Sequence, residues 1–158
     1  MKNTIAALFG LYLFLISKIH KISISITGLK GYGFILIRNK GKVIIGDNFK
    51  FNSGKRYNPI GGDTLLRIIV RKNSKLIIGD NVGISNSTIN VHELIEIGNN
   101  TIIGGGCKLW DGDFHSTNKF KRNSKNYSKK PIIIKENVWI GGCSIILKGV
   151  TIGSNSII

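Results

Sequence analysis

Histidine is the side chain whose ordinary pKa lies closest to neutral pH, and the chain contains three of them, His20, His92 and His115. A positioned imidazole can act as a general base that removes the proton of an attacking hydroxyl. His115 ends the stretch DGDFH, where a six-residue rhythm of the sequence stops, so it lies where a loop leaves the repeat. We interpret His20 as an interfacial or solvated side chain and His92 as a loop or coil-surface residue. His115 is therefore the candidate base.

Two aspartates precede His115 at intervals of two residues. In extended backbone, residues two apart share a face, so Asp111, Asp113 and His115 are expected to point the same way. A carboxylate on that face can orient an imidazole. The alternative is that the aspartates cap a turn. The two interpretations are equally supported for Asp113, whereas turn capping is favoured for Asp111.

The two cysteines, Cys107 and Cys143, stand outside any CxxC pair. Their spacing argues against a zinc site or a redox motif, and we expect no metal site. A nucleophilic cysteine needs an activating neighbour, which the sequence does not identify. We interpret both as small residues in or near a packed core, which suits a reducing compartment.

The composition indicates one β-rich domain with a strongly basic surface. Of 158 residues, 42% are hydrophobic, and 20 glycines against 2 prolines suit many tight turns. The net charge of +15 favours an anionic partner, such as a nucleic acid, an acidic bilayer or a phosphorylated small molecule. The aromatic residues do not alternate with basic ones and no zinc-finger spacing is present, so we expect no nucleic-acid partner.

The N-terminal segment, residues 1–21, differs in composition from the rest. Residues 5–16 read IAALFGLYLFLI, flanked by Lys2 and Lys18. A helix needs about 20 apolar residues to span a bilayer, so this one is too short. It either packs on the domain or attaches to an anionic membrane surface, and we favour attachment. We expect a cytoplasmic protein with this segment as its candidate attachment to the inner face of the plasma membrane.

A repeat of six residues decides the expected fold. The phrase recurs as VIIGDN at 43–48, LIIGDN at 76–81, IEIGNN at 95–100, IIIKEN at 132–137 and VTIGSN at 150–155. At the C-terminal end, isoleucines recur at every sixth residue, at positions 140, 146, 152 and 158. Because this period is neither 3.6 nor 2, the chain must turn a corner after each unit. Repeats of this kind stack and bury a continuous core.

The predicted fold class is therefore all-β, a parallel β-helix over residues 22–158 preceded by a short apolar helix. Three units close a triangular coil, and the aliphatic residue of each unit points inward. A small or β-branched residue follows four positions later, as Thr101 follows Ile97 and Cys107 follows Ile103. The basic stretch STNKFKRNSKNYSKK at 116–130 breaks the rhythm and is expected to protrude as a loop.

Three stretches of the sequence resemble a known family. ISNSTI at 84–89, IGGGCKLWDGDFHS at 103–116 and PIIIKENVWIGGCSIILKGVTIGSNSII at 131–158 are similar to the left-handed β-helix, hexapeptide-repeat acyltransferases. The branch they resemble includes galactoside and maltose O-acetyltransferases and the O-acetyltransferases of capsule and lipopolysaccharide assembly. The resemblance covers residues 43–158. It implies acetyl-CoA as acyl donor, a saccharide acceptor that can be lipid-linked, and a homotrimer with sites between subunits.

The resemblance also implies roles for particular residues. His115 is the catalytic base, with Asp113 beside it, and the Gly142 N–H is the oxyanion donor. The donor-binding residues are Trp139, near the pantetheine arm, with Gly141 and Gly142. Asn86 contacts the acceptor, and Asp111 is a second candidate there. Structural roles remain open for Asn86, which tolerates turn conformations, and for the glycines, which suit turns.

One departure from the family opens alternatives to this function. Members continue past GVTIGSNSII with a stretch similar to GAGSVVTKD that helps to hold coenzyme A, whereas this chain stops at Ile158. We therefore expect a fragment, a shortened copy, or an end covered by another subunit. A shortened, non-catalytic β-helix that assembles or binds an anionic glycan is one alternative. Acetylation of serine or of an amino sugar is another.

Overall fold

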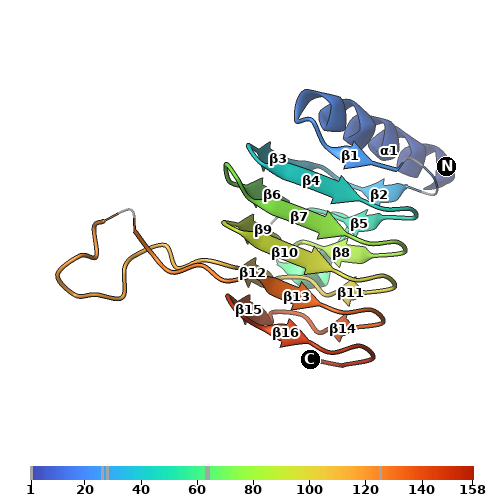
Figure 1. Ribbon diagram of the computed structural model, residues 1–158. Helices are drawn as coiled ribbons and strands as arrows, with labels where there is room; N and C mark the ends of the chain where they lie inside the picture. The colour runs from blue at the N-terminus through green and yellow to red at the C-terminus, as the bar shows by residue number, and fades with distance from the viewer. Residues whose placement is uncertain (1, 26, 28, 63–64, 125) are drawn as a thin grey trace.

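The computed structural model describes residues 2–25, 27, 29–62, 65–124 and 126–158. Its strands form three parallel sheets that wind as stacked triangular coils, from the N-terminal helix at one end to the last strand at the other (Figure 1). Consecutive strands belong to different sheets, and each strand pairs with the equivalent strand of the next coil. The predicted left-handed parallel β-helix is confirmed.

Each sheet takes every third strand along the repeat. Sheet A contains β1 (Ser23–Ile24), β4 (Lys42–Ile45), β7 (Lys75–Ile78), β10 (Leu94–Ile97), β13 (Ile132–Ile134) and β16 (Thr151–Ile152). Sheet B contains β2 (Lys30–Tyr32), β5 (Lys50–Asn52), β8 (Gly83–Ser85), β11 (Ile102–Ile103) and β14 (Trp139–Ile140). Sheet C contains β3 (Ile35–Asn39), β6 (Leu66–Val70), β9 (Thr88–Val91), β12 (Lys108–Trp110) and β15 (Ile145–Leu147).

The inward aliphatic side chains form the core, as the six-residue period predicts. In sheet A, Ile45, Ile78, Ile97 and Ile134 occupy one register, and each is at most 3% exposed. Burying such a side chain stabilises the fold by about 1.5–3 kcal/mol, so the ladder is the main source of stability. Val150 departs from the pattern and is 37% exposed, because it belongs to the last coil, where no described coil packs on its outer side.

Asparagines in left-handed conformation make the corner between sheets A and B. Asn48, Asn81, Asn100, Asn137 and Asn155 have φ between 54° and 63°. Asparagine tolerates this region better than other residues that carry a Cβ. The Asn81 side-chain amide donates to Asn100 Oδ1 at 3.0 Å, so neighbouring corners are also linked through their side chains. The recurring GDN and GNN motifs are thus the turn chemistry of the coil.

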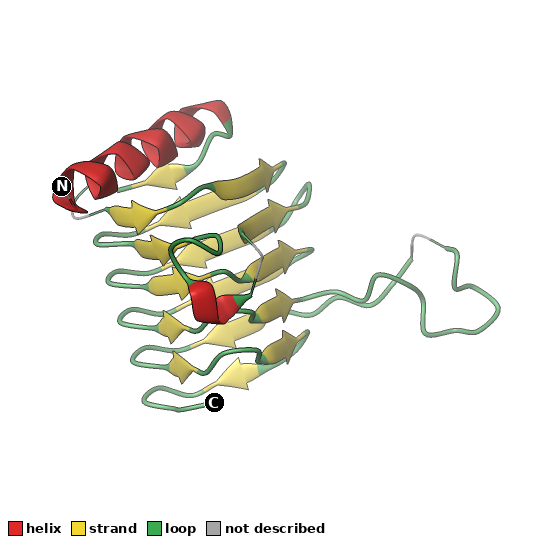
Figure 2. Ribbon diagram, turned by 180° about the vertical axis from the view of Figure 1, so that it is seen from behind, coloured by secondary structure: helices red, strands yellow, loops and turns green. Residues whose placement is uncertain are grey.

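Helix α1 (Lys2–Ile19) lies across the N-terminal end of the coils (Figures 1 and 2). Leu13 is 1% exposed and Ile16 packs against the core. The Tyr12 hydroxyl donates to the Ile35 carbonyl at 3.3 Å. The predicted N-terminal helix is present and covers the open end of the solenoid. Among the described residues, no helix is long and apolar enough to cross a membrane.

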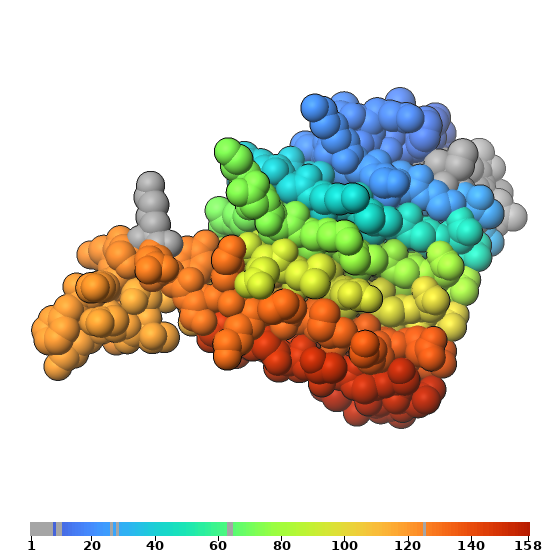
Figure 3. Space-filling view, viewed as in Figure 1, coloured from blue at the N-terminus to red at the C-terminus, as the bar shows by residue number. Residues whose placement is uncertain are grey.

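Two excursions interrupt the repeat. The first, between β5 and β6, contains the short helix η1 (Pro59–Gly61), which lies against the side of the coils (Figure 2). The second, between β12 and β13, stands out from the body as a long arm (Figure 3). This arm contains the predicted loop at 116–130. Strand β1 is short, and its residues Ser23 and Ile24 pair with Ile44 and Ile45 of β4.

Candidate active site

His115 and Asp113 follow β12, at the corner between sheets C and A where the arm leaves the coil. The Lys148 ammonium pairs with Asp113 Oδ1 at 2.7 Å, and the Asp113 N–H donates to the Ser128 carbonyl at 2.8 Å. Asp113 Oδ2 is buried and has no hydrogen-bond partner within the part of the chain that the structure describes. His115 is exposed. The site thus offers an accessible imidazole close in sequence to a fixed carboxylate.

Asp111 is fully buried and its carboxylate is occupied by the backbone. Oδ1 accepts from the His92 N–H at 2.6 Å, and Oδ2 accepts from the Glu93 N–H at 2.8 Å. By accepting both N–H groups, this carboxylate fixes the turn between β9 and β10 in the neighbouring coil. The arrangement corresponds to the turn-capping alternative, and substrate binding by Asp111 stays a prediction.

The predicted donor-binding residues lie on β14 and the turn that follows it. Trp139 is 55% exposed, as its outward position predicts. The Gly141 N–H donates to the Ile158 carbonyl at 2.7 Å. Gly142 is exposed, and its N–H donates no hydrogen bond to any residue that the structure describes. This N–H is therefore free to meet an oxyanion.

The two groups of predicted residues occupy different corners of neighbouring coils. Gly142 lies between sheets B and C, whereas His115 lies between sheets C and A. Strand β15, which pairs with β12, separates the two corners by at least three extended residues, roughly 10 Å. One hydroxyl cannot contact both groups at this separation. A single chain therefore does not bring the predicted base and the predicted oxyanion donor together.

Asn86 is 1% exposed and ties the first excursion to the coil. Its Oδ1 accepts from the Gly54 N–H at 2.6 Å, and its amide donates to the Asn58 carbonyl at 3.1 Å. Its φ of 34° lies in the left-handed region that asparagine tolerates. These contacts give Asn86 a structural role, and its contact with an acceptor stays a prediction.

His92 lies in the turn between β9 and β10, which agrees with the expected loop position, but it is not a surface residue. It is only 4% exposed, because the returning part of the arm covers it. His92 Nδ1 lies 2.8 Å from the Tyr127 hydroxyl. Burial lowers the pKa of His92, and the nearby charges of Arg71 and Lys129 lower it further, against an opposing effect of Asp111.

The cysteines differ from one another in their surroundings. Cys107 is buried as expected, and burial raises the pKa of its thiol, which makes it a poor nucleophile. Cys143 was expected in or near the core, but it is exposed at a corner with φ of 64°, so it is not a core residue. Its corner conformation turns the side chain away from the interior. Among the described residues, no group of three His, Cys, Asp or Glu side chains is placed to hold a metal ion.

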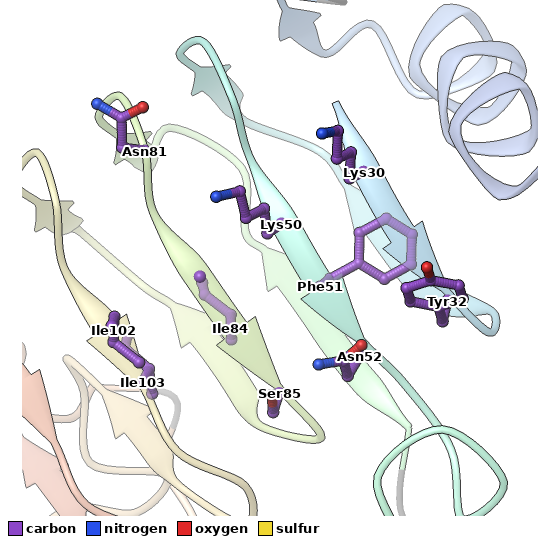
Figure 4. Close-up of a pocket in the computed structure, with 11 residues that line it drawn as sticks. Lys30, Tyr32, Lys50, Phe51, Asn52, Asn81, Ile84, Ser85, Ile102 and Ile103 are labelled. Carbon is purple, nitrogen blue, oxygen red and sulfur yellow. The ribbon is translucent and has the colours of Figure 1, made fainter. Parts of the chain in front are cut away.

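A separate cavity lies over sheet B, on strands β2, β5, β8 and β11 (Figure 4). Lys30 and Lys50 stand at one side of it and Tyr32 at another. Its described lining contains neither a histidine nor an acid. It therefore offers binding surface without a general base, and the acid–base chemistry stays with His115.

No family model matches the chain. Curated relatives match parts of it, among them two named as acetyltransferases. A Schizosaccharomyces pombe protein named as an acetyltransferase is 43% identical over 65 residues, which are 41% of this chain and 31% of that protein. The galactoside O-acetyltransferase of Escherichia coli is 38% identical over 73 residues, which are 46% of this chain and 36% of that enzyme. The matches thus span about a third of the length of these relatives.

Among solved structures, a hexapeptide-repeat acetyltransferase of Vibrio cholerae, solved with acetyl coenzyme A, aligns with a TM-score of 0.49 and 25% identity. The alignment covers 78% of this chain and 55% of that one. The fold was established above from the strand pairing of this chain itself. The chain therefore has the left-handed β-helix fold with a hexapeptide repeat, and its sequence is similar over less than half of its length to proteins named as acetyltransferases.

Proposed function

We propose that the chain is an acetyl-CoA-dependent O-acetyltransferase that acetylates a saccharide hydroxyl, with a role in assembling cell-surface polysaccharide. The observation that carries the proposal is His115, an exposed imidazole two residues after Asp113 at the corner where the arm begins. The sequence similarity to a galactoside O-acetyltransferase supports the choice of a sugar hydroxyl.

In the proposed reaction, His115 takes the proton of the acceptor hydroxyl as its oxygen attacks the thioester carbonyl. The Gly142 N–H donates to the oxyanion that forms there. The C–S bond then breaks, the acetyl group stays on the acceptor oxygen, and coenzyme A leaves as the thiol with the proton held by His115. Asp113 orients and stabilises the imidazolium. Trp139 and Gly141 line the path of the donor.

We propose a homotrimer, because the separation of His115 from Gly142 leaves the site incomplete in one chain. Cyclic symmetry would set the His115 corner of one subunit against the Gly142 corner of the next, and would repeat the same site three times. Oligomers of this kind place different surface patches of identical chains against one another. Sedimentation of the full chain should therefore give the mass of three copies.

Turnover of acetyl-CoA with candidate sugars tests the proposal. The wild-type chain should transfer the acetyl group to a sugar hydroxyl, and His115→Ala should reduce the rate by about 10²–10⁴-fold with an unchanged fold. His20→Ala is the matched control, since His20 lies beside the capping helix. A folded trimer without turnover, or a fully active His115→Ala variant, would contradict the proposal. The first of these outcomes would favour a non-catalytic module that binds glycan.

The capping helix supports a second proposal, attachment to an anionic membrane surface. Leu8, Leu11, Leu15 and Ile19 lie on one face of α1 and are 55–75% exposed. Lys18 flanks this apolar stripe, and the chain carries a net charge of +15. An apolar stripe with flanking cations binds in the plane of an anionic interface. Attachment at the inner face of the plasma membrane would place the enzyme near lipid-linked sugars.

Flotation with vesicles tests this attachment. The full chain should float with vesicles that contain phosphatidylserine, and Leu11→Glu/Leu15→Glu should stay in the dense fraction. Lys42→Gln/Lys135→Gln is the control for charge, because it changes exposed lysines outside α1. Equal flotation of the Leu11→Glu/Leu15→Glu variant would exclude attachment through the stripe. A larger assembly that this variant reduces to trimers would show that a second copy covers the stripe instead.

A further inference from the structure

The corner between sheets C and A carries a cavity on the N-terminal side of the arm. It has a volume of about 450 Å³ and is lined by Lys40, Arg71, Lys72, His92, Asn126, Tyr127 and Lys129. We call it the corner cavity. Four of its lining residues are cationic, and no acid lines it among the described residues. The cavity lies on the same edge of the β-helix as His115.

The fold itself places these cations in a column. Lys40 follows β3, Arg71 and Lys72 follow β6, and His92 follows β9, which are neighbouring strands of sheet C. The Lys40 N–H donates to the Val70 carbonyl at 2.9 Å, and the Arg71 N–H donates to the Val91 carbonyl at 3.0 Å. The backbone thereby fixes the spacing of the cations from coil to coil.

The returning part of the arm closes the cavity. The Lys130 N–H donates to the Asp111 carbonyl at 3.0 Å, and Gly112 forms an antiparallel bridge with Lys129. The Tyr127 hydroxyl contacts His92 Nδ1, and this contact holds the arm against the coil beside Lys129, which lines the cavity. The cavity is therefore built from both the solenoid and the arm.

The cations of the corner cavity are not neutralised by the acids that the structure describes. Lys40, Arg71, Lys72 and Lys129 form no ion pair with any acid that the structure describes. The carboxylate of Asp111, whose charge acts on His92, is buried and occupied by two backbone N–H groups. Like charges gathered at one cavity repel each other, and a bound anion relieves that repulsion.

His92 supplies a second, independent observation that points to a ligand site. It is 4% exposed, and its Nε2 has no hydrogen-bond partner among the described residues. A buried polar atom without a partner costs free energy, so such an atom in a cavity wall indicates a group that binds there. Arg71 and Lys129 also lower the pKa of His92, which shows that their charges act on the cavity wall.

We propose that the corner cavity binds a phosphate-bearing group with more than one negative charge. Arg71 can donate to phosphate oxygens as a fork, and the three lysines act as point charges. On the proposed function, this group belongs to the acyl acceptor, as the diphosphate of a lipid-linked or nucleotide-linked sugar whose hydroxyl reaches His115. The binding of the anion itself does not depend on catalysis.

Calorimetric titration of the full chain with inorganic pyrophosphate, at about 0.15 M salt, tests the site. Arg71→Gln/Lys72→Gln should weaken binding by about tenfold or more. The matched control is Lys108→Gln/Lys135→Gln, which removes the same charge from the other two corners of the coil. The control should bind within about twofold of the wild type, because it lowers only the general positive field.

The imidazole resonances give a second measurement, in a chain with only three histidines. Pyrophosphate should raise the pKa of His92, because a nearby anion stabilises the imidazolium and offsets Arg71 and Lys129. No binding by the folded wild-type chain, or equal weakening in the control, would overturn the site. Saturating coenzyme A distinguishes the two sources of phosphate. Retained pyrophosphate binding supports the acceptor, and displacement by coenzyme A would overturn the acceptor assignment while leaving the anion site in place.

Discussion

At the scale of single residues, a substitution of Asp113 can distinguish its two possible roles, a catalytic carboxylate and a turn cap. Its ion pair with Lys148 is about a quarter exposed, and such pairs contribute about 0–1 kcal/mol to the free energy of unfolding. Asp113→Asn should therefore leave thermal stability nearly unchanged but lower the acetyl-transfer rate by about tenfold or more, because the imidazolium loses its stabilising charge. Melting curves and turnover assays check both parts. Unchanged turnover would show that Asp113 only caps the turn.

His92 predicts how stability depends on pH. Its pKa is lowered in the folded chain, so between that value and the ordinary value near 6.5 the unfolded chain binds more protons than the folded chain. The contribution of His92 to stability is therefore complete above about pH 6.5 and is lost as the pH falls below it.

Denaturant unfolding at several pH values measures this effect. The wild-type chain should lose more free energy of unfolding between pH 7 and pH 5 than His92→Gln does, since glutamine does not titrate. His115→Gln is the comparison, because that histidine is exposed. The same pH slope in His92→Gln and the wild type would contradict the assignment.

At the scale of elements, the asparagine corners predict a contrast between two substitutions. Asn100 has φ of 57° in the corner after β10. Asn100→Gly should change the free energy of unfolding little, since glycine adopts this region readily and offsets the lost side-chain contact with Asn81. Asn100→Val should cost about 1–2 kcal/mol, because a branched Cβ is strained there. Equal effects of the two in chemical denaturation would contradict this explanation.

The elements also show what the sequence could and could not predict. The six-residue spacing of Ile97, Ile103 and Leu109 predicted the coils and their core. The chain turns one corner after each unit, and the aliphatic residue of each unit points inward. The burial of His92 could not be predicted, since it depends on Tyr127, which is distant in sequence and returns with the arm. A contact between two segments so far apart in the chain produces no periodic pattern in the sequence.

The candidate site, too, could be predicted from the sequence only in part. DGDFH predicted His115 and Asp113 as candidates, because the six-residue rhythm stops there, and their roles stay a prediction. Lys148, the partner of Asp113, was not foreseen, since its position depends on β15 pairing with β12 across the whole arm. The distance between the His115 and Gly142 corners likewise follows from the winding of the coil. That distance depends on which sheets contain β12 and β14, and the sequence alone does not give the sheets.

At the scale of the whole molecule, stability rests on contacts between successive coils. Ile95 is fully buried and pairs with Leu76 on one side and Ile132 on the other. Ile95→Ala should cost about 2–5 kcal/mol, because its neighbours on both sides are fixed by the ladder and cannot close the cavity. Chemical denaturation checks the value. The exposed Ile102→Ala is the control, and it should cost clearly less.

The central claim is that His115 of one subunit and Gly142 of the next act on one substrate. Co-expression of His115→Ala with Gly142→Pro, which removes the N–H, tests it most directly. Each variant alone should be nearly inactive. In randomly mixed trimers, roughly a quarter of the interfaces combine an intact His115 with an intact Gly142, so about a quarter of the wild-type acetyl-transfer rate should return. Mixed trimers that stay as inactive as the single variants would contradict the claim.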